Sequence, residues 1–186
     1  MEFHQIKARM EAQFGQELIK DMDDQVQQPW LEVDSASLAE VALFLRDEAD
    51  LGFDFLNNLS GVDYGPDSQT LGVTYHLSSL IHEHHLVLKV KLDRANPEPV
   101  PSLAAIWRTA EWHEREAYDL VGIPFENHPD LRRILMPADW EGHPLRKDYQ
   151  AASHYHGVAI DYEEAQEEGL KTWDEQLPNE QELPGE

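Results

Sequence analysis

Histidines gather in one short stretch of the chain, where they suggest a metal site. His82, His84 and His85 surround Glu83, and His76 lies a few residues earlier. Imidazole and carboxylate groups are common ligands of zinc and other transition metals. The cluster falls in the expected connector between two strands, and it lacks the helical spacing of the HExxH motif. We therefore interpret it as a polar turn, and keep a stand-alone metal-dependent hydrolase as the alternative of another class.

A pair of carboxylates, Glu114 and Glu116, is the second candidate for chemistry. Two acids that flank one bond are the usual machinery of a glycosidase. On the helix expected here, side chains two positions apart point about 200° apart around the axis, so this pair cannot flank one bond. The same helix places Arg115 four residues from both Glu111 and Asp119. We expect Arg115 to be partly buried between these two carboxylates and to order the chain that follows.

Four basic side chains, Arg132, Arg133, Arg146 and Lys147, lie in a proline-rich stretch after this helix. Arginine matches the geometry of phosphate and carboxylate groups, so a nucleotide pocket is one interpretation. Neither a glycine-rich phosphate loop nor a GxSxG nucleophile motif occurs in the sequence. Because arginine and aromatic residues are enriched at protein interfaces, we favour a structural or docking role.

The whole chain is strongly acidic and contains no cysteine. Its 186 residues include 37 acidic and 14 basic side chains, which give a formal net charge of −23. This charge disfavours general binding to nucleic acid, because phosphates require a basic surface. Without thiols there are no disulfides, cysteine nucleophiles or cysteine-ligated iron–sulfur clusters. We recognise neither an apolar run that could span a membrane nor a signal peptide, and expect a cytoplasmic protein.

Hydrophobic periodicity places the candidate residues in an α+β domain. Helices are expected over residues 3–22, 37–49 and 102–121, and strands over 29–33, 53–59, 73–77 and 86–92. The last two strands form a hairpin, which predicts a mixed or antiparallel sheet with helices packed on one face. An extended stretch follows over residues 123–150, in which residues 129–135 are expected to form two helical turns.

The composition changes near residue 150 and suggests two parts. Residues 1–150 form the expected domain, with its most distinctive region over 102–150. Residues 151–186 form an acidic C-terminal extension with ten acids and a single base, Lys171. The extension also carries Tyr155, Ile160, Tyr162, Leu170, Trp173 and Leu177. These apolar side chains favour partial docking of the extension over free disorder.

Three sequence blocks between residues 114 and 149 resemble one known family. They read EREAYDLVGI from residue 114, HPDLRRIL from residue 128 and GHPLRKDY from residue 142. Together they are similar to the C-terminal motif of the 30-kDa-type subunit of respiratory complex I, which is the C-type subunit of NADH–quinone oxidoreductase. The residues that carry the resemblance and form the expected interface are Glu114, Arg115, Glu116, Tyr118, Asp119, Gly122, His128, Pro129, Arg132, Arg133, Gly142, Pro144, Arg146, Lys147, Asp148 and Tyr149.

The resemblance implies a non-catalytic structural subunit in the peripheral arm of a proton-translocating complex. It implies no catalytic, cofactor-binding or metal-binding residue on this chain, and places FMN, iron–sulfur clusters and quinone on partner subunits. The implied partners are the 49-kDa-type subunit at the quinone cavity and the iron–sulfur subunits, on the cytoplasmic side of the bacterial plasma membrane. The family usually continues with proline after Lys-Asp-Tyr, whereas Gln150 follows here.

Two alternatives stay open beside the metal-dependent hydrolase. The chain could be the equivalent subunit of a membrane-bound hydrogenase or of a dehydrogenase with another electron donor, because these share the motif. It could also be a free acidic adaptor unrelated to electron transfer.

Overall fold

The computed structural model describes residues 1–160 of the chain. Residues 161–186, which hold most of the expected acidic extension, lie outside the described residues. The chain divides into two compact units, Met1–Tyr149 and Gln150–Glu186, and each is considered by itself. In the second unit, β8 (His154–Tyr155) and β9 (Val158–Ala159) form a short antiparallel pair.

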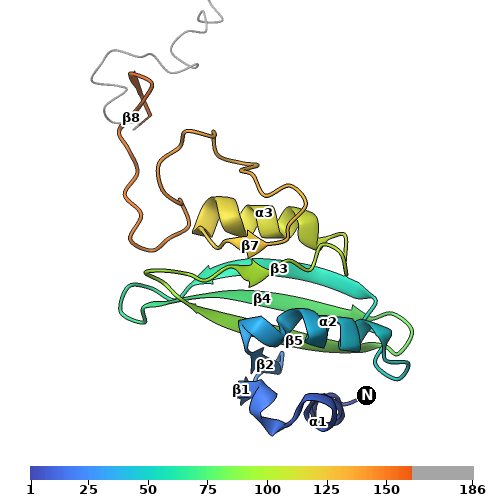
Figure 1. The fold of residues 1–186 in the computed structure, drawn as a ribbon. Helices are drawn as coiled ribbons and strands as arrows, with labels where there is room; N and C mark the ends of the chain where they lie inside the picture. Colours follow the sequence, from blue (N-terminus) through green and yellow to red (C-terminus); the bar gives the residue numbers. More distant parts are fainter. Residues whose placement is uncertain (161–186) are drawn as a thin grey trace, which may run out of the picture. The chain divides into compact units, whose positions relative to one another are not determined.

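A five-stranded mixed sheet organises the first unit (Figure 1). Its strand order is β1-β2-β5-β4-β3, in which β2 and β5 are parallel and the other neighbours antiparallel. The strands are β1 (Ile19–Asp23), β2 (Trp30–Val33), β3 (Phe55–Asp63), β4 (Thr70–Ser79) and β5 (His84–Asp93). A second, two-residue parallel pair joins β6 (Val100–Pro101) to β7 (Phe125–Glu126).

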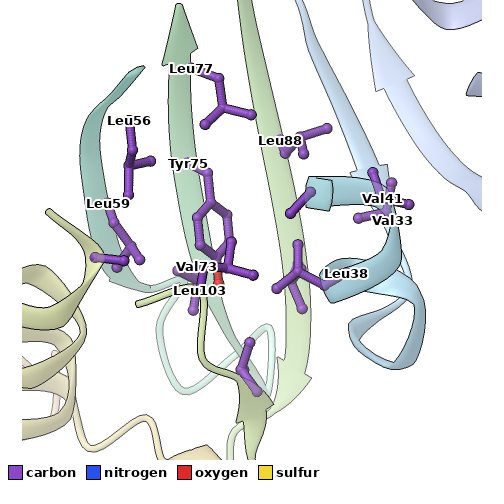
Figure 2. Packing of buried hydrophobic residues seen from close by; sticks show 14 of the residues in the cluster. Val33, Leu38, Val41, Leu56, Leu59, Val73, Tyr75, Leu77, Leu88 and Leu103 are labelled. Carbon is purple, nitrogen blue, oxygen red and sulfur yellow. The ribbon is translucent and has the colours of Figure 1, made fainter. Parts of the chain in front are cut away.

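The helices pack on one face of the sheet, as the sequence predicted. They are α1 (Phe3–Phe14), α2 (Leu38–Asp47) and α3 (Ala110–Val121), with single 3₁₀ turns at Gln16–Leu18 and Ser35–Ser37. Val73, Tyr75 and Leu77 alternate along β4, and all three are buried on the face that the helices cover (Figure 2). The α+β fold class is therefore confirmed. None of the helices in residues 1–160 combines the length and apolar character needed to cross a membrane.

Two predicted helix boundaries were wrong. The helix expected over residues 3–22 ends at Gly15, whose φ of +91° breaks the helical path, and the chain continues into β1. The helix expected from residue 102 begins only at Ala110. The carboxylate of Glu114 accepts hydrogen bonds from the Ser102 hydroxyl and the Leu103 amide, so these residues fold back onto the helix instead of extending it.

The helical turns predicted over residues 129–135 are also absent, and this segment has an irregular conformation. Side chains of α3 bind its backbone groups, as described below. Those contacts replace the local hydrogen bonds that a helix would have formed.

Candidate interaction site: helix α3 and residues 122–149

Asp119 of α3 organises the segment that follows the helix. Its fully buried carboxylate accepts the backbone N–H groups of Ile134, Leu135 and Met136, at 3.0, 2.7 and 2.9 Å, and the Arg133 guanidinium at 3.2 Å. Burial alone would raise the pKa of Asp119. The three N–H groups and the charge of Arg133 outweigh that effect and hold the pKa below its usual range. A single side chain thus fixes four consecutive residues.

Arg115 also orders this segment, but not through the predicted partners. Its Nε donates to the Arg132 carbonyl at 3.2 Å, and its Nη1 lies 4.0 Å from the Asp130 carboxylate. The guanidinium lies 4.7 Å from the ring centre of Trp112. Among residues 1–160 no ion pair joins Arg115 to Glu111 or Asp119, so the predicted acid–arginine–acid ladder was wrong. The expected burial of Arg115 is confirmed, since only 4% of its surface is exposed.

The block GHPLRKDY caps the C-terminal end of α3. His143 Nδ1 donates to the carbonyl of Asp119, the Leu145 amide to that of Leu120, and Arg146 Nε to that of Val121, at 2.8 to 2.9 Å. These are carbonyls that a helix end leaves without intrahelical partners. The block therefore folds against the helix end, at the opposite end from Trp112.

Gly122 makes this cap sterically possible. It adopts a left-handed conformation with φ of +78° and ends the helix. A Cβ atom on Gly122 would lie 2.4 Å from the His143 ring. The imidazole therefore occupies the space that any other residue would need.

An ion-pair network of buried Arg94 and Asp63 with the exposed Asp148 anchors the end of the same block. Arg94 binds Asp63 through two hydrogen bonds of 3.0 Å and also binds Asp148 bidentately. Asp63 additionally accepts the Lys147 amide at 2.8 Å. The hydrogen bonds from Arg94, with those from the Lys147 and Gly65 amides, hold the pKa of Asp63 well below its usual range despite burial.

Sequence reasoning missed Asp63 and Arg94. The signal was available in the topology: β3 and β5 both pair antiparallel with β4, so their C-terminal ends lie at the same end of the sheet. Opposite charges at those two ends are therefore placed to meet.

Glu114 occupies the interior instead of a catalytic cleft. Its carboxylate accepts the hydrogen bonds from Ser102 and Leu103 described above. In addition, its Oε2 lies 3.9 Å from the Nε2 of His128. That histidine nitrogen donates to the Glu111 carbonyl, while the Asp130 amide donates to Nδ1. Burial raises the pKa of Glu114 to about 7, against the opposing effect of its two hydrogen bonds.

The raised pKa predicts a pH-dependent stability that Glu114→Gln should remove. Between about pH 4.5 and 7 the folded protein holds a proton on Glu114 that the unfolded chain releases, so stability falls as the pH rises through this window. The free energy of unfolding of the wild type relative to Glu114→Gln should therefore drop by about 2.5 kcal/mol from pH 5 to 8. Urea denaturation of both proteins measures this difference.

The comparison with Glu114→Gln isolates one group from others that titrate nearby. Burial lowers the pKa values of His84 and His143, which makes the protein more stable as the pH rises. This opposite contribution is common to both proteins and cancels. A difference that stays constant from pH 5 to 8 would show that Glu114 does not titrate there.

The remaining predicted residues lie at or near the surface of the site. Arg132, with 70% of its side chain exposed, pairs with Asp130, and Tyr149 accepts a hydrogen bond from Trp140 and packs against Gly142. Glu116, Pro129 and Lys147 are exposed, and Tyr118 and Pro144 are half-buried. Three of the four basic side chains bind groups of the domain itself: Arg132 pairs with Asp130, Arg133 binds Asp119, and Arg146 caps the helix.

The histidines near residue 82 lie elsewhere and hold the β4–β5 connector. His82 Nε2 and His84 Nε2 bind the carbonyls of Ala49 and Leu51 at 2.9 and 2.7 Å, and His85 binds the Ser78 hydroxyl. Within the described part of the chain, no three His, Asp or Glu side chains are grouped as metal ligands.

Comparison with known proteins decides the family. Residues 31–155, from β2 through the whole 122–149 segment, match the family described as "Respiratory-chain NADH dehydrogenase, 30 Kd subunit". The chain belongs to this family. The resemblance drawn from residues 114–149 is therefore confirmed, and the helix-capping and Asp119 contacts lie within the matched part of this 30 Kd subunit fold.

Relatives of the 30 Kd subunit family match over much of the chain, and each is the C-type subunit of an NADH-quinone oxidoreductase. The relative from Chloroherpeton thalassium is 44% identical over 162 residues, which are 86% of this chain and 66% of that protein. The relative from Chlorobium phaeobacteroides is 45% identical over 80% of this chain and 89% of its own length. The relative from Roseiflexus sp. is 53% identical over 60% of this chain and 63% of its own length. The chain thus spans less than two thirds of the first and third relatives.

A solved structure supports the fold alone. One chain in the structure of the membrane-bound sulfane sulfur reductase, an archaeal respiratory membrane complex, superposes with a TM-score of 0.65 at 19% identity. The alignment covers 79% of this chain and 85% of that chain.

Proposed function

We propose that this chain is a structural, non-catalytic subunit of a proton-translocating NADH–quinone oxidoreductase, held in the peripheral arm of that complex. The observation that carries the proposal is that polar side chains of the matched region bind and fix an irregular segment of the chain. Asp119, Arg115 and Arg146 hold the irregular segment 122–149 against α3. An irregular segment fixed so tightly suits a preformed interface, because little ordering entropy remains to be lost on binding.

The surface of this site carries residue types that anchor protein interfaces. Trp112 is 58% exposed and stacked on Arg115, Arg132 is mostly exposed, and Leu135 and Leu145 are 62% and 56% exposed. Tryptophan and arginine dominate the binding energy of many interfaces. We infer that these side chains contact other subunits of the complex.

The names of the relatives suggest who those partners are. They are called subunits of NADH-quinone oxidoreductase, which favours an NADH-linked complex over one with another electron donor. The proposed neighbours are the 49-kDa-type subunit at the quinone cavity and the iron–sulfur subunits, with FMN, clusters and quinone bound by those partners. Peripheral attachment on the cytoplasmic side of the membrane follows from this assignment.

Purification of the tagged full chain from detergent-solubilised membranes tests the proposal. We expect flavin- and cluster-bearing subunits to co-purify, with NADH:quinone activity in the same fraction. Trp112→Ala combined with Leu135→Ser should reduce that recovery, whereas Leu43→Ser, a comparably exposed change on α2, should not. A solitary monomer would contradict the proposal, and co-purification with a hydrogenase would favour the other-donor alternative.

A further inference from the structure

The connector between β4 and β5 presents an unusual apolar surface. Residues 80–83, called the hairpin tip below, include Leu80 and Ile81, which are 67% and 77% exposed. These are the two most exposed of the large apolar side chains in the described part of the chain. Hairpin connectors usually carry polar residues and glycine, so two adjacent aliphatic side chains here require an explanation.

Hydrogen bonds to neighbouring loops hold the hairpin tip in one conformation. The Leu80 amide donates to the Asp54 carboxylate at 3.0 Å, and the His82 amide to the Ser79 hydroxyl at 3.2 Å. His82 Nε2 reaches the Ala49 carbonyl, and its ring stacks on that of the buried His84 at 5.6 Å between centres. The exposed aliphatic side chains therefore extend from a fixed base, which lowers the entropy cost of docking.

The surroundings of the hairpin tip are acidic. Glu83 lies in the tip, Asp54 binds it directly, and Glu48 and Asp50 flank the Ala49 carbonyl that His82 contacts. Arg9 is the base that pairs with two of these four acids. The local balance of these five side chains is thus 1 − 4 = −3. Such a charge opposes contact with anionic lipid and with a second copy of the same surface.

We propose that the hairpin tip is a second docking point of this chain, at which Leu80 and Ile81 enter an apolar pocket bordered by lysine or arginine on another protein subunit. The pocket chemistry follows from the two aliphatic side chains and the acidic rim around them. The identity of the partner as a subunit of the same complex rests on the proposed function. The tip, residues 80–83, is separate in sequence from α3 and residues 122–149.

A photo-crosslinking residue placed at Ile81 tests the contact in the assembled complex. The tagged full chain is expressed in its own cells, irradiated, and purified from solubilised membranes. We expect one crosslinked product, identified by mass spectrometry as this chain joined to another subunit of the complex. The same residue placed at Leu43, which is 42% exposed on α2, is the matched control and should give no such product.

Substitutions test the two parts of the proposed chemistry. Leu80→Ser with Ile81→Ser should weaken retention of the chain in the complex by roughly tenfold or more, whereas Leu43→Ser should leave retention unchanged. Glu83→Gln should weaken retention less and reduce its dependence on salt. The isolated serine variant should keep the melting temperature of the wild type, because both side chains are already exposed.

The outcomes separate this inference from the proposed function. If wild-type chain recovers flavin- and cluster-bearing subunits but Ile81 crosslinks to none of them, only the docking role of the tip is wrong. A crosslink to lipid or to a second copy of the chain would also overturn it. If the wild-type chain recovers no such subunits, the proposed function is wrong, and so is the proposal that the tip docks with a subunit of that complex.

Discussion

Replacing Asp119 by alanine should destabilise the first unit by about 3–5 kcal/mol. The substitution leaves the Arg133 guanidinium and the amides of Ile134, Leu135 and Met136 without the acceptor that now binds all four. Unpaired buried donors are costly, and an unpaired charge more so. Urea denaturation at pH 7 measures the loss, and proteolysis after Arg132 or Arg133 should report release of the segment.

Two variants of the same helix sharpen this test. Asp119→Asn keeps one acceptor oxygen but turns an amide group toward Arg133, so its loss should be intermediate. Glu116→Ala removes an exposed carboxylate and should change stability by less than about 0.5 kcal/mol. Equal losses for Asp119→Ala and Glu116→Ala would contradict the assigned role.

The part of the Asp119 contribution that depends on its negative charge should also be lost in acid. Its folded pKa lies below the unfolded value of 3.8, so its stabilising effect is complete above that pH. The effect is lost as the pH falls through the lowered folded pKa. The difference in stability between wild type and Asp119→Ala should therefore become smaller at low pH.

Gly122→Ala should cost about 3–5 kcal/mol, although it adds a single methyl group. The left-handed conformation costs a residue with a side chain about 1–2 kcal/mol. The new Cβ would lie 2.4 Å from the His143 ring, which must move and give up its hydrogen bond to the Asp119 carbonyl. Displacement of packed groups and loss of a hydrogen bond account for the remainder. Thermal and urea unfolding measure the sum.

The clash and the backbone strain can be measured separately. Gly65 also has a positive φ, +96°, but nothing lies within 4 Å of its hypothetical Cβ, so Gly65→Ala should show the backbone cost alone. Introducing Gly122→Ala into a His143→Ala background removes the steric partner, and the added loss should fall to about 1–2 kcal/mol. If the loss is the same in both backgrounds, the imidazole is not the obstacle.

Both predictions concern the same junction between α3 and the segment that follows it. If this surface docks with partner subunits as proposed, Asp119→Ala and Gly122→Ala should reduce incorporation of the chain at permissive temperature, where the unit is still folded. The sheet-face core would stay intact, because neither residue contributes to the β4 packing shown in Figure 2.

The sequence by itself determined two things: that helices cover one face of a sheet, and to which family the chain belongs. Alternating residues such as Val73, Tyr75 and Leu77 must face one side of a strand, so the hairpin and its buried face could be predicted from periodicity. The motif over residues 114–149 was specific enough to name the family. Helix ends were less predictable. The helix ends at Gly15, although the apolar periodicity continues beyond it in the sequence. Ser102 lies outside the helix in which it was expected, because its hydroxyl donates a hydrogen bond to Glu114.

Only the tertiary structure decided the partners of the charged residues. Spacing of four residues brings Arg115 near Asp119, yet a long guanidinium side chain can turn to any acceptor within reach. The acceptor it meets is the Arg132 carbonyl, on a segment with no local periodicity. Asp63 and Arg94 meet across 31 residues because strand topology brings two strand ends together. Such contacts depend on where the chain returns in space, which local sequence patterns do not encode.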